Sequence, residues 1–378
     1  MSDRKLTILG SAAALMVIWA VFQSRISNKP PAETDLPVYL IQGFDPTDIG
    51  SIVIGTGKDT VTLSRQAERF VVVNKDNYPA VTGEINKLLT SCLDVRPIEL
   101  YTDDPANHKD LGVTEEDADR VVKFLRPDSS LLTGVIIGNT KEQGQNTYVR
   151  LVTSNKVYLT SEAPLIRDRP IDYIDRNLIS VERTDIESVT VTSGDESYTL
   201  KSQDHSVLLE NPQEGKKQKD NDCQRVLTAL TNLRFEDIMS AAKAAEQEIN
   251  FDKQYACTLK DSTVYNLKIA RKMAKEGYKT YAICDAEFTD KTPITKDDAV
   301  ESEEQLKKKE AKLLARDTAN EFSAKHQGWV YEIADYQAEN LTTRLPELIQ
   351  DKEEPKEEKS VQTGDPNESS PDEIETEE

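Results

Sequence analysis

The body of this chain occurs twice, and that repetition constrains its fold more than any single motif does. The segment DIGSIVI, beginning at Asp48, matches DIESVTV, beginning at Asp185, 137 residues further on. With one extra residue, LTSCLDVR at Leu89–Arg96 matches LTALTNLR at Leu227–Arg234. Because several such matches keep their order over a whole domain length, the sequence predicts a tandem duplication.

Towards the end of each copy, the distance in sequence between matching segments changes. TYVRLV at Thr147 matches TYAICD at Thr280, 133 residues on, whereas VYL at Val157 matches VYEI at Val330, 173 residues on. The second copy therefore carries a 40-residue insertion, which we place at residues 289–327. Its strong helix formers, acidic first and basic later, predict a solvated helical hairpin or protrusion. A partner-docking arm is the alternative.

Within each copy, runs of β-branched and apolar residues separated by turn residues predict mostly consecutive strands. Apolar residues at helical spacing predict a few amphipathic helices beside them. The fold class is therefore α+β, a duplicated and mostly antiparallel sheet unit with few packing helices, and a doubly wound parallel fold is the less favoured alternative. The expected helices or closing segments are 82–93 and 163–178 in the first copy, and 224–233 and 337–349 in the second.

An apolar segment precedes the duplicated body. Residues 6–22 read LTILGSAAALMVIWAVF without a charge, after Arg4 and Lys5. This length suits one transmembrane helix, and the small residues of a signal-peptide cleavage site are poorly placed after it. We expect an uncleaved anchor in the bacterial inner (plasma) membrane, single-pass, with the bulk of the chain extracytoplasmic. A cleaved signal peptide and a buried core helix are the alternatives.

These features divide the chain into an ordered series of segments. They are the N-terminal transmembrane anchor at 1–26, a Pro-rich linker at 27–43, a first α+β repeat at 44–180, a second at 181–350 with the helical insertion 289–327, and an acidic tail at 351–378. The tail holds 12 acidic and 3 basic residues, so it has little to bury and is expected to be disordered.

Charge and motifs exclude several function classes. The net charge of -21 repels phosphate backbones, which disfavours nucleic-acid binding. The chain has no P-loop, GxSxG, HExxH or GxGxxG motif, and its three histidines are far apart. We therefore nominate no catalytic, cofactor-binding or metal-binding residue, expect no cofactor, and expect no enzymatic activity.

Two charged segments carry competing interpretations. The loop YTDDPANHKD, with Asp103, Asp104, His108 and Asp110, could hold a hard cation, but its spacing matches no EF-hand and a solvated turn is favoured. The run IRDRPIDYIDR alternates in sign, which is typical of local ion pairs and less so of anion capture by its arginines. Its charged members are Arg167, Asp168, Arg169, Asp172, Asp175 and Arg176.

The four cysteines lie far from one another in sequence, and no pair has CxxC spacing. Cys92 and Cys223 fall in or near expected helices, while Cys257 and Cys284 fall in expected strands. Buried free thiols are the favoured interpretation, and a Cys257–Cys284 disulfide is the one pairing that an exported chain would allow.

Certain phrases give the chain a family resemblance. FVVVNKDNYPAVTGEINKLLTSCLDV, the LGV at Leu111, the YVRLVTSNKVYLTS hairpin and RDRPIDYIDRNL resemble the bacterial domain-of-unknown-function 4340 family over most of residues 40–290. The chain departs from the family pattern at Tyr78, where the preceding strand carries Phe70 instead of a Trp, and in the arm at 289–327.

The resemblance implies a membrane-anchored accessory of an ABC exporter. Members of the family are commonly encoded beside ABC-2-type permeases and auxiliary components like those of gliding-motility transporters, so these are the implied partners. No catalytic residues are established for the family. We expect an extracytoplasmic binding or scaffold module with a groove at the junction of the copies. The alternatives are a cell-envelope hydrolase using Asp103, Asp104 or Asp110, and a cytoplasm-facing structural protein with an acidic recruiting tail.

Overall fold

The computed structural model describes residues 36–141, 144–203, 206–275, 277–293 and 302–352. The predicted anchor, the start of the Pro-rich linker and nearly all of the predicted acidic tail lie outside these ranges. Within them, none of the helices has the length and apolar character needed to cross a bilayer. The described chain is α+β, with two large antiparallel sheets and few helices, as predicted.

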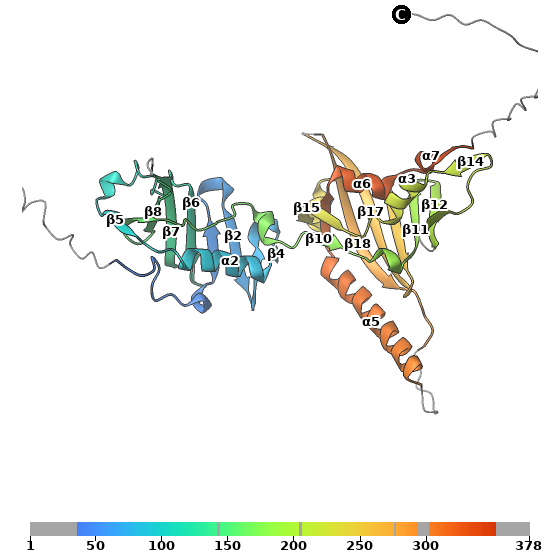
Figure 1. Ribbon diagram of the computed structural model, residues 1–378, viewed down its shortest axis with the longest axis horizontal. Coiled ribbons are helices and arrows are strands. Elements are labelled where there is room, and N and C mark those ends of the chain that lie inside the picture. Colours follow the sequence, from blue (N-terminus) through green and yellow to red (C-terminus); the bar gives the residue numbers. More distant parts are fainter. Residues whose placement is uncertain (1–35, 142–143, 204–205, 276, 294–301, 353–378) are drawn as a thin grey trace, which may run out of the picture.

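The first sheet is built from residues 51–160 and has one helix across it. Its spatial order is β4 (Tyr78–Pro79), β3 (Arg69–Val72), β2 (Val61–Gln66), β1 (Ser51–Ile54), β6 (Arg120–Leu125), β7 (Leu131–Thr140), β8 (Thr147–Leu151), β9 (Val157–Thr160) and β5 (Glu99–Thr102). Helix α2 (Thr82–Leu93) lies across its strands (Figure 1). Ile85, Leu88 and Cys92 form the buried stripe of this helix, because their spacing places them on one side.

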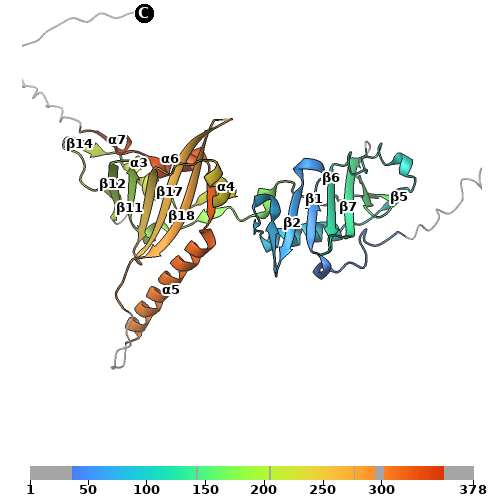
Figure 2. The ribbon, with the colours of Figure 1, turned by 180° about the vertical axis from the view of Figure 1, so that it is seen from behind.

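The second sheet is built from residues 177–333. Its order is β10 (Asn177–Ile179), β15 (Leu233–Ser240), β19 (Trp329–Ile333), β18 (Gly277–Phe288), β17 (Thr263–Ala274), β16 (Lys253–Leu259), β11 (Ile186–Ser193), β12 (Glu196–Gln203) and β13 (Ser206–Leu209). β14 (Lys216–Gln218) and β20 (Ile349–Asp351) form a separate pair. The helices are α3 (Asp220–Leu227), α4 (Ala241–Glu246), α5 (Glu303–His326), α6 (Asp335–Thr342) and α7 (Leu345–Leu348). The two sheets lie end to end along the long axis of the molecule (Figures 1 and 2).

Eight of the nine strands in each sheet follow the same spatial order, and β4 and β10 are the exceptions. The order β3-β2-β1-β6-β7-β8-β9-β5 in the first corresponds to β13-β12-β11-β16-β17-β18-β19-β15 in the second. The pairing register is also the same: Ile52 faces Leu63 in β1–β2, and 137 positions further on Val189 faces Leu200 in β11–β12. Since one residue of slip would turn every side chain to the other face, a shared register means that both sheets bury equivalent positions.

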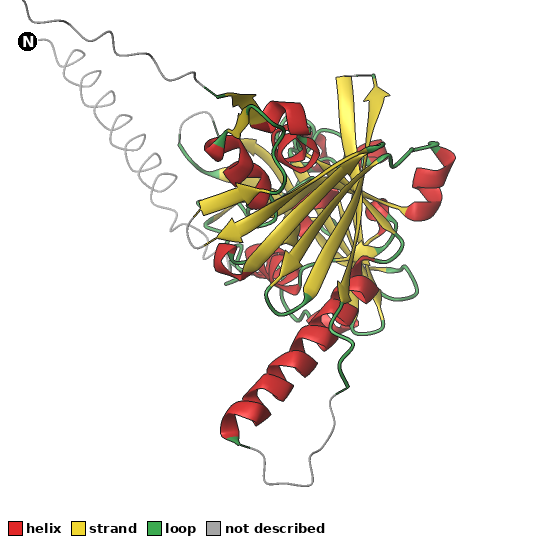
Figure 3. Cartoon of the chain, turned by 90° about the vertical axis from the view of Figure 1, so that its right-hand side faces the viewer, coloured by secondary structure: helices red, strands yellow, loops and turns green. Residues whose placement is uncertain are grey.

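The insertion lies between the two strands of the second repeat that correspond to β8 and β9. Val149 faces Tyr158 in β8–β9, and Ala282 faces Tyr331 in β18–β19, so the additional residues enter between these two strands. The described part of this insertion holds one 24-residue helix, α5, as expected of a helical protrusion. The helix begins at a capping box made by Ser302 and Gln305. Its second half packs on β18, and its first half projects away from the sheets (Figure 3).

Three further expectations are corrected by the structure. Residues 163–178 form no α-helix; Pro164 and Pro170 interrupt them, Pro170–Tyr173 form a short 3-10 helix, and Asn177 begins β10, which joins the second sheet. The helix expected at 224–233 is α3, which starts earlier and ends at Leu227, so that Leu233 begins β15. The helix expected at 337–349 is split into α6 and α7, with Pro346 in the first turn of the second.

All four cysteines are buried and free. Cys257 lies on β16 and Cys284 on β18, and β17 separates these strands with Leu267 facing Cys284. The disulfide considered between them is therefore absent for a geometric reason. Burial raises the pKa of the Cys92 and Cys257 thiols to about 12, so both remain protonated near neutral pH.

Candidate functional site

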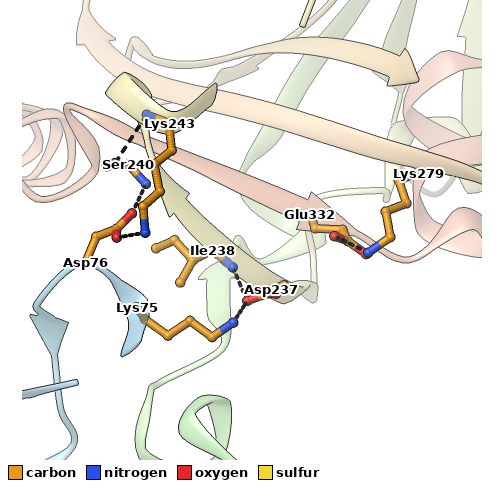
Figure 4. A network of polar contacts seen from close by, with 8 residues as sticks. All are labelled: Lys75, Asp76, Asp237, Ile238, Ser240, Lys243, Lys279 and Glu332. Carbon is orange, nitrogen blue, oxygen red and sulfur yellow. Dashed lines mark hydrogen bonds and ion pairs between the residues drawn. The ribbon is translucent and has the colours of Figure 1, made fainter. Parts of the chain in front are cut away.

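The two sheets meet through a short turn at the edge of the first. The turn follows β3, and Asp76 and Asn77 adopt the left-handed conformation there, with φ of 55° and 63°. Asp and Asn tolerate this region better than other residues with side chains, so the NKDN sequence allows the reversal. The turn brings the side chains of Lys75 and Asp76 against β15 and the start of α4 (Figure 4).

Two ionic contacts cross this junction. Lys75 Nζ lies 2.5 Å from Asp237 Oδ1, and the Asp237 carboxylate also accepts the N–H of Ile238 at 2.7 Å. Asp76 accepts the N–H of Ser240 at 2.9 Å and binds the Lys243 ammonium with its other oxygen. Burial alone would raise the pKa of Asp76, but the hydrogen bonds from Lys243 and Ser240 outweigh it and lower the pKa.

Aromatic side chains pack against one another at the same junction. Tyr78 of β4 is 5% exposed, and its ring meets Trp329 edge-on at a centroid distance of 4.9 Å. The Phe235 ring centroid lies 6.4 Å from that of Tyr78 and 5.0 Å from that of Tyr331. Edge-to-face pairs of this kind contribute about 0.5–1.5 kcal/mol beyond their buried area, more than exposed ion pairs do. The centre of the predicted junction is therefore filled by the chain's own side chains.

A groove of about 370 Å³ opens beside this packed contact and receives residues from both repeats. Glu84 of α2 binds Arg167 at 3.1 Å, and Asp172 binds Arg169 at 2.7 Å. The remaining basic groups are Arg176 and Arg234, which line the groove from the connector before β10 and from β15.

These two arginines differ from their neighbours in their contacts. The guanidinium groups of Arg176 and Arg234 form no hydrogen bond or ion pair with the residues that the structure describes. The third groove acid, Asp175, accepts the backbone N–H of Asn177 at 3.0 Å. The groove can therefore accept a negatively charged group without first breaking an internal ion pair.

The residues considered from the sequence are only partly brought together. Arg169 and Asp172 form the local ion pair that the alternating charges predict. Asp103, Asp104 and Asp110 are exposed, and Asp104 caps a short 3-10 helix (Pro105–Asn107) by accepting the N–H of Ala106. Across the described part of the chain, no three His, Cys, Asp or Glu side chains are grouped as a metal site would need.

The three histidines are likewise separate. His108 is buried, and its Nε2 lies 2.9 Å from the carbonyl of Asn155, which fastens the acidic loop to the β8–β9 turn. His326 is buried at the end of α5, and its Nδ1 lies 2.6 Å from the Tyr331 hydroxyl. His205 lies outside the described residues.

Sequence reasoning missed the four charges that cross the junction. Lys75 and Asp237 are 162 positions apart, and each is of a type usually found on the surface. The one local signal was the Asp-Asn pair, which predicts a turn but does not indicate what the turn contacts.

Residues 71–254 match the family model described as Domain of unknown function (DUF4340). The matched range runs from β3 into β16, so it includes both sides of the junction and all four charges that cross it. No curated protein and no solved structure matches the chain.

Proposed function

Since this chain is a member of the DUF4340 family, we propose that it is a membrane-anchored, extracytoplasmic binding and scaffold module that carries out no reaction of its own. It would serve as an accessory of an ABC-type transport complex in the bacterial inner membrane. The uncharged segment at residues 6–22 supports the anchor. The family resemblance supports a permease as the partner.

The observation that carries the binding role is the groove at the junction. It draws residues from both repeats, and the ionic and aromatic contacts beside it hold those repeats in one arrangement. Arg176 and Arg234 stand in it without internal carboxylate partners among the described residues. Arginine binds carboxylates in a planar, bidentate manner, so an acidic segment of a partner subunit fits this place.

The surroundings of the ionisable groups favour binding over chemistry. The pKa of Tyr173 is raised by burial, and its hydroxyl donates to the carbonyl of Arg167 at 2.9 Å. Burial likewise raises the pKa of Cys223 to about 11. A nucleophile or general base requires a pKa near the working pH, and these groups are displaced away from it.

A pull-down from detergent-solubilised membranes tests the proposal. We expect permease subunits to co-purify with the tagged full chain. We expect their recovery to fall at least about tenfold with the double variant Arg176→Ala/Arg234→Ala, because interfacial arginine–carboxylate pairs contribute several kcal/mol.

Arg126→Ala is the matched control. This exposed arginine lies in the turn between β6 and β7 and binds the carbonyl of Leu131 at 3.3 Å, so it should leave recovery unchanged. The absence of permease subunits from the wild-type eluate, or equal recovery with the double variant, would contradict the proposal.

A further inference from the structure

A second groove, of about 470 Å³, lies within the second repeat and is lined by four basic and three acidic residues, the acids being Asp222, Glu339 and Glu347. Its cations come from four elements: Arg225 from α3, Lys253 from β16, Arg271 from β17 and Arg344 from the start of α7. The whole chain carries a net charge of -21, so four cations around one depression are not a general property of its surface. With its three acids the groove keeps a local excess of one positive charge, and physiological salt screens charges beyond about 8 Å.

Two of the four cations have no anionic partner. Asp222 binds Arg225 at 2.5 Å, and Glu347 lies 3.8 Å from Arg344. Arg271 stacks on the ring of Tyr278 at 4.7 Å, which leaves its N–H edge available. Neither Arg271 nor Lys253 forms an ion pair with any residue in the described ranges.

The first repeat shows what usually occupies this place. The strand pair β11–β16 corresponds to β1–β6. Cys257 faces Val189 in the second repeat as Phe124 faces Ile52 in the first. Counting back four residues from each, Lys253 is equivalent to Arg120. In the first repeat the Arg120 guanidinium is neutralised by Asp168 at 3.1 Å and by Asp119 at 3.2 Å.

The acid that neutralises Arg120 has no counterpart in the second repeat. In both repeats, the segment after the last strands hydrogen-bonds to the residue just before a packing helix. The carbonyl of Tyr173 accepts the N–H of Val81, before α2, and the carbonyl of Leu348 accepts the N–H of Lys219, before α3. The i,i+3 pair Arg169–Asp172 therefore corresponds to Arg344–Glu347, and Asp168 corresponds to Thr343. A neutral hydroxyl stands where the carboxylate was.

We propose that the groove of the second repeat binds a phosphate group, which takes the place of the missing carboxylate. Lys253 and Arg271 supply the unpaired positive charge, and Arg225 and Arg344 lie within the same depression. Ionised phosphate oxygens accept charge-assisted hydrogen bonds from ammonium and guanidinium groups, which are stronger than neutral ones. Free inorganic phosphate and the phosphate of a glycerol-linked lipid headgroup share this chemistry.

Isothermal titration calorimetry on the full chain in non-ionic detergent tests this site, with inorganic phosphate and glycerol phosphate as separate probes. We expect saturable binding that weakens with added salt. Binding of both probes indicates free phosphate as the source, whereas binding of glycerol phosphate alone indicates a headgroup. If neither probe binds, the proposal is overturned.

Thr343→Asp is the decisive variant, because it restores the carboxylate of the first repeat without removing a cation. We expect it to weaken binding at least about tenfold, and Lys253→Gln to act in the same direction. Arg120→Gln, at the matching position of the first repeat, should leave the affinity unchanged. Wild-type affinity in Thr343→Asp, with an unaltered circular dichroism spectrum, would overturn the proposal.

Discussion

At the scale of single residues, the side chain whose chemistry is most altered by the fold is His326. It is 3% exposed, its ring contacts Phe322 at a centroid distance of 4.3 Å, and its Nδ1 lies 2.6 Å from the Tyr331 hydroxyl. Burial, with a smaller effect from Lys325, lowers its pKa to about 4. The ring is therefore neutral in the folded protein at any pH above that value.

This burial predicts a loss of stability in mild acid. In the unfolded chain His326 takes up a proton near pH 6.5, whereas the folded chain does so near 4. The unfolded state therefore binds more protons than the folded state as the pH falls through this window. The free energy of unfolding should fall by about 2 kcal/mol between pH 7 and pH 5. Urea unfolding of the wild type and of His326→Gln at both pH values measures the effect.

The difference between the two proteins isolates this histidine, because all carboxylates remain common to both. We expect the wild type to lose about 2 kcal/mol more than His326→Gln on going to pH 5. Equal losses in the two proteins would show that His326 does not resist protonation.

At the scale of elements, the sequence predicted those parts whose pattern is local. Helix α2 and the β1–β2–β3 meander follow from apolar spacing over a few residues, and both are present. The segment at 163–178 was expected to close the first repeat, but two prolines interrupt it, and its last two residues enter β10, whose partner strand β15 lies far along the chain. Arg176 was noted as a charge and Arg234 only as part of the repeat, because which groove arginines remain unpaired depends on tertiary contacts.

Gly138 of β7 shows how the LGV segment is fastened to the first sheet. A Cβ at this position would lie 2.4 Å from the Leu111 carbonyl and 2.6 Å from Val113 Cγ1, which is too close for either. We expect Gly138→Ala to destabilise the fold by about 1–3 kcal/mol, because a buried backbone atom would have to move. Urea unfolding at neutral pH measures the change.

Gly83→Ala is the matched control for Gly138→Ala. At Gly83, in the first turn of α2, the nearest atom to an added Cβ is Val81 Cγ1 at 4.0 Å. Alanine favours helix over glycine by about 0.5–1 kcal/mol, so this variant should be neutral or slightly more stable. Equal free energies of unfolding for the two variants would argue against close packing at Gly138.

At the scale of the whole molecule, the two repeats are joined by contacts between residues far apart in sequence. Asp76 is central among them, because it binds both the backbone of Ser240 and the ammonium of Lys243. Removing its carboxylate leaves two donors of the second repeat without their acceptor. Such a loss costs about 1–3 kcal/mol when the donors stay desolvated.

Asp76→Ala is therefore expected to weaken the coupling of the repeats more than it weakens either repeat alone. Scanning calorimetry should show a broader or divided unfolding transition, with a calorimetric enthalpy larger than the van't Hoff enthalpy. Asp195→Ala, in the exposed turn between β11 and β12, should leave the trace unchanged. A single transition of wild-type width in Asp76→Ala would mean that the aromatic contacts alone couple the repeats.

The shared strand order has a consequence for assembly. The β3–β4 edge of the first repeat meets the β10–β15 edge of the second, so two non-equivalent edges of the repeat are joined. Head-to-tail contacts of this kind do not by themselves limit the number of units that can be added. At the outer ends, Lys216 stands at the position of Tyr78, and Lys156 at that of Trp329. The Gln218 side chain also accepts the N–H of Leu209 and donates to the carbonyl of Val207, both on the outermost strand β13. The two outer ends therefore lack the aromatic pair that joins the repeats at the junction.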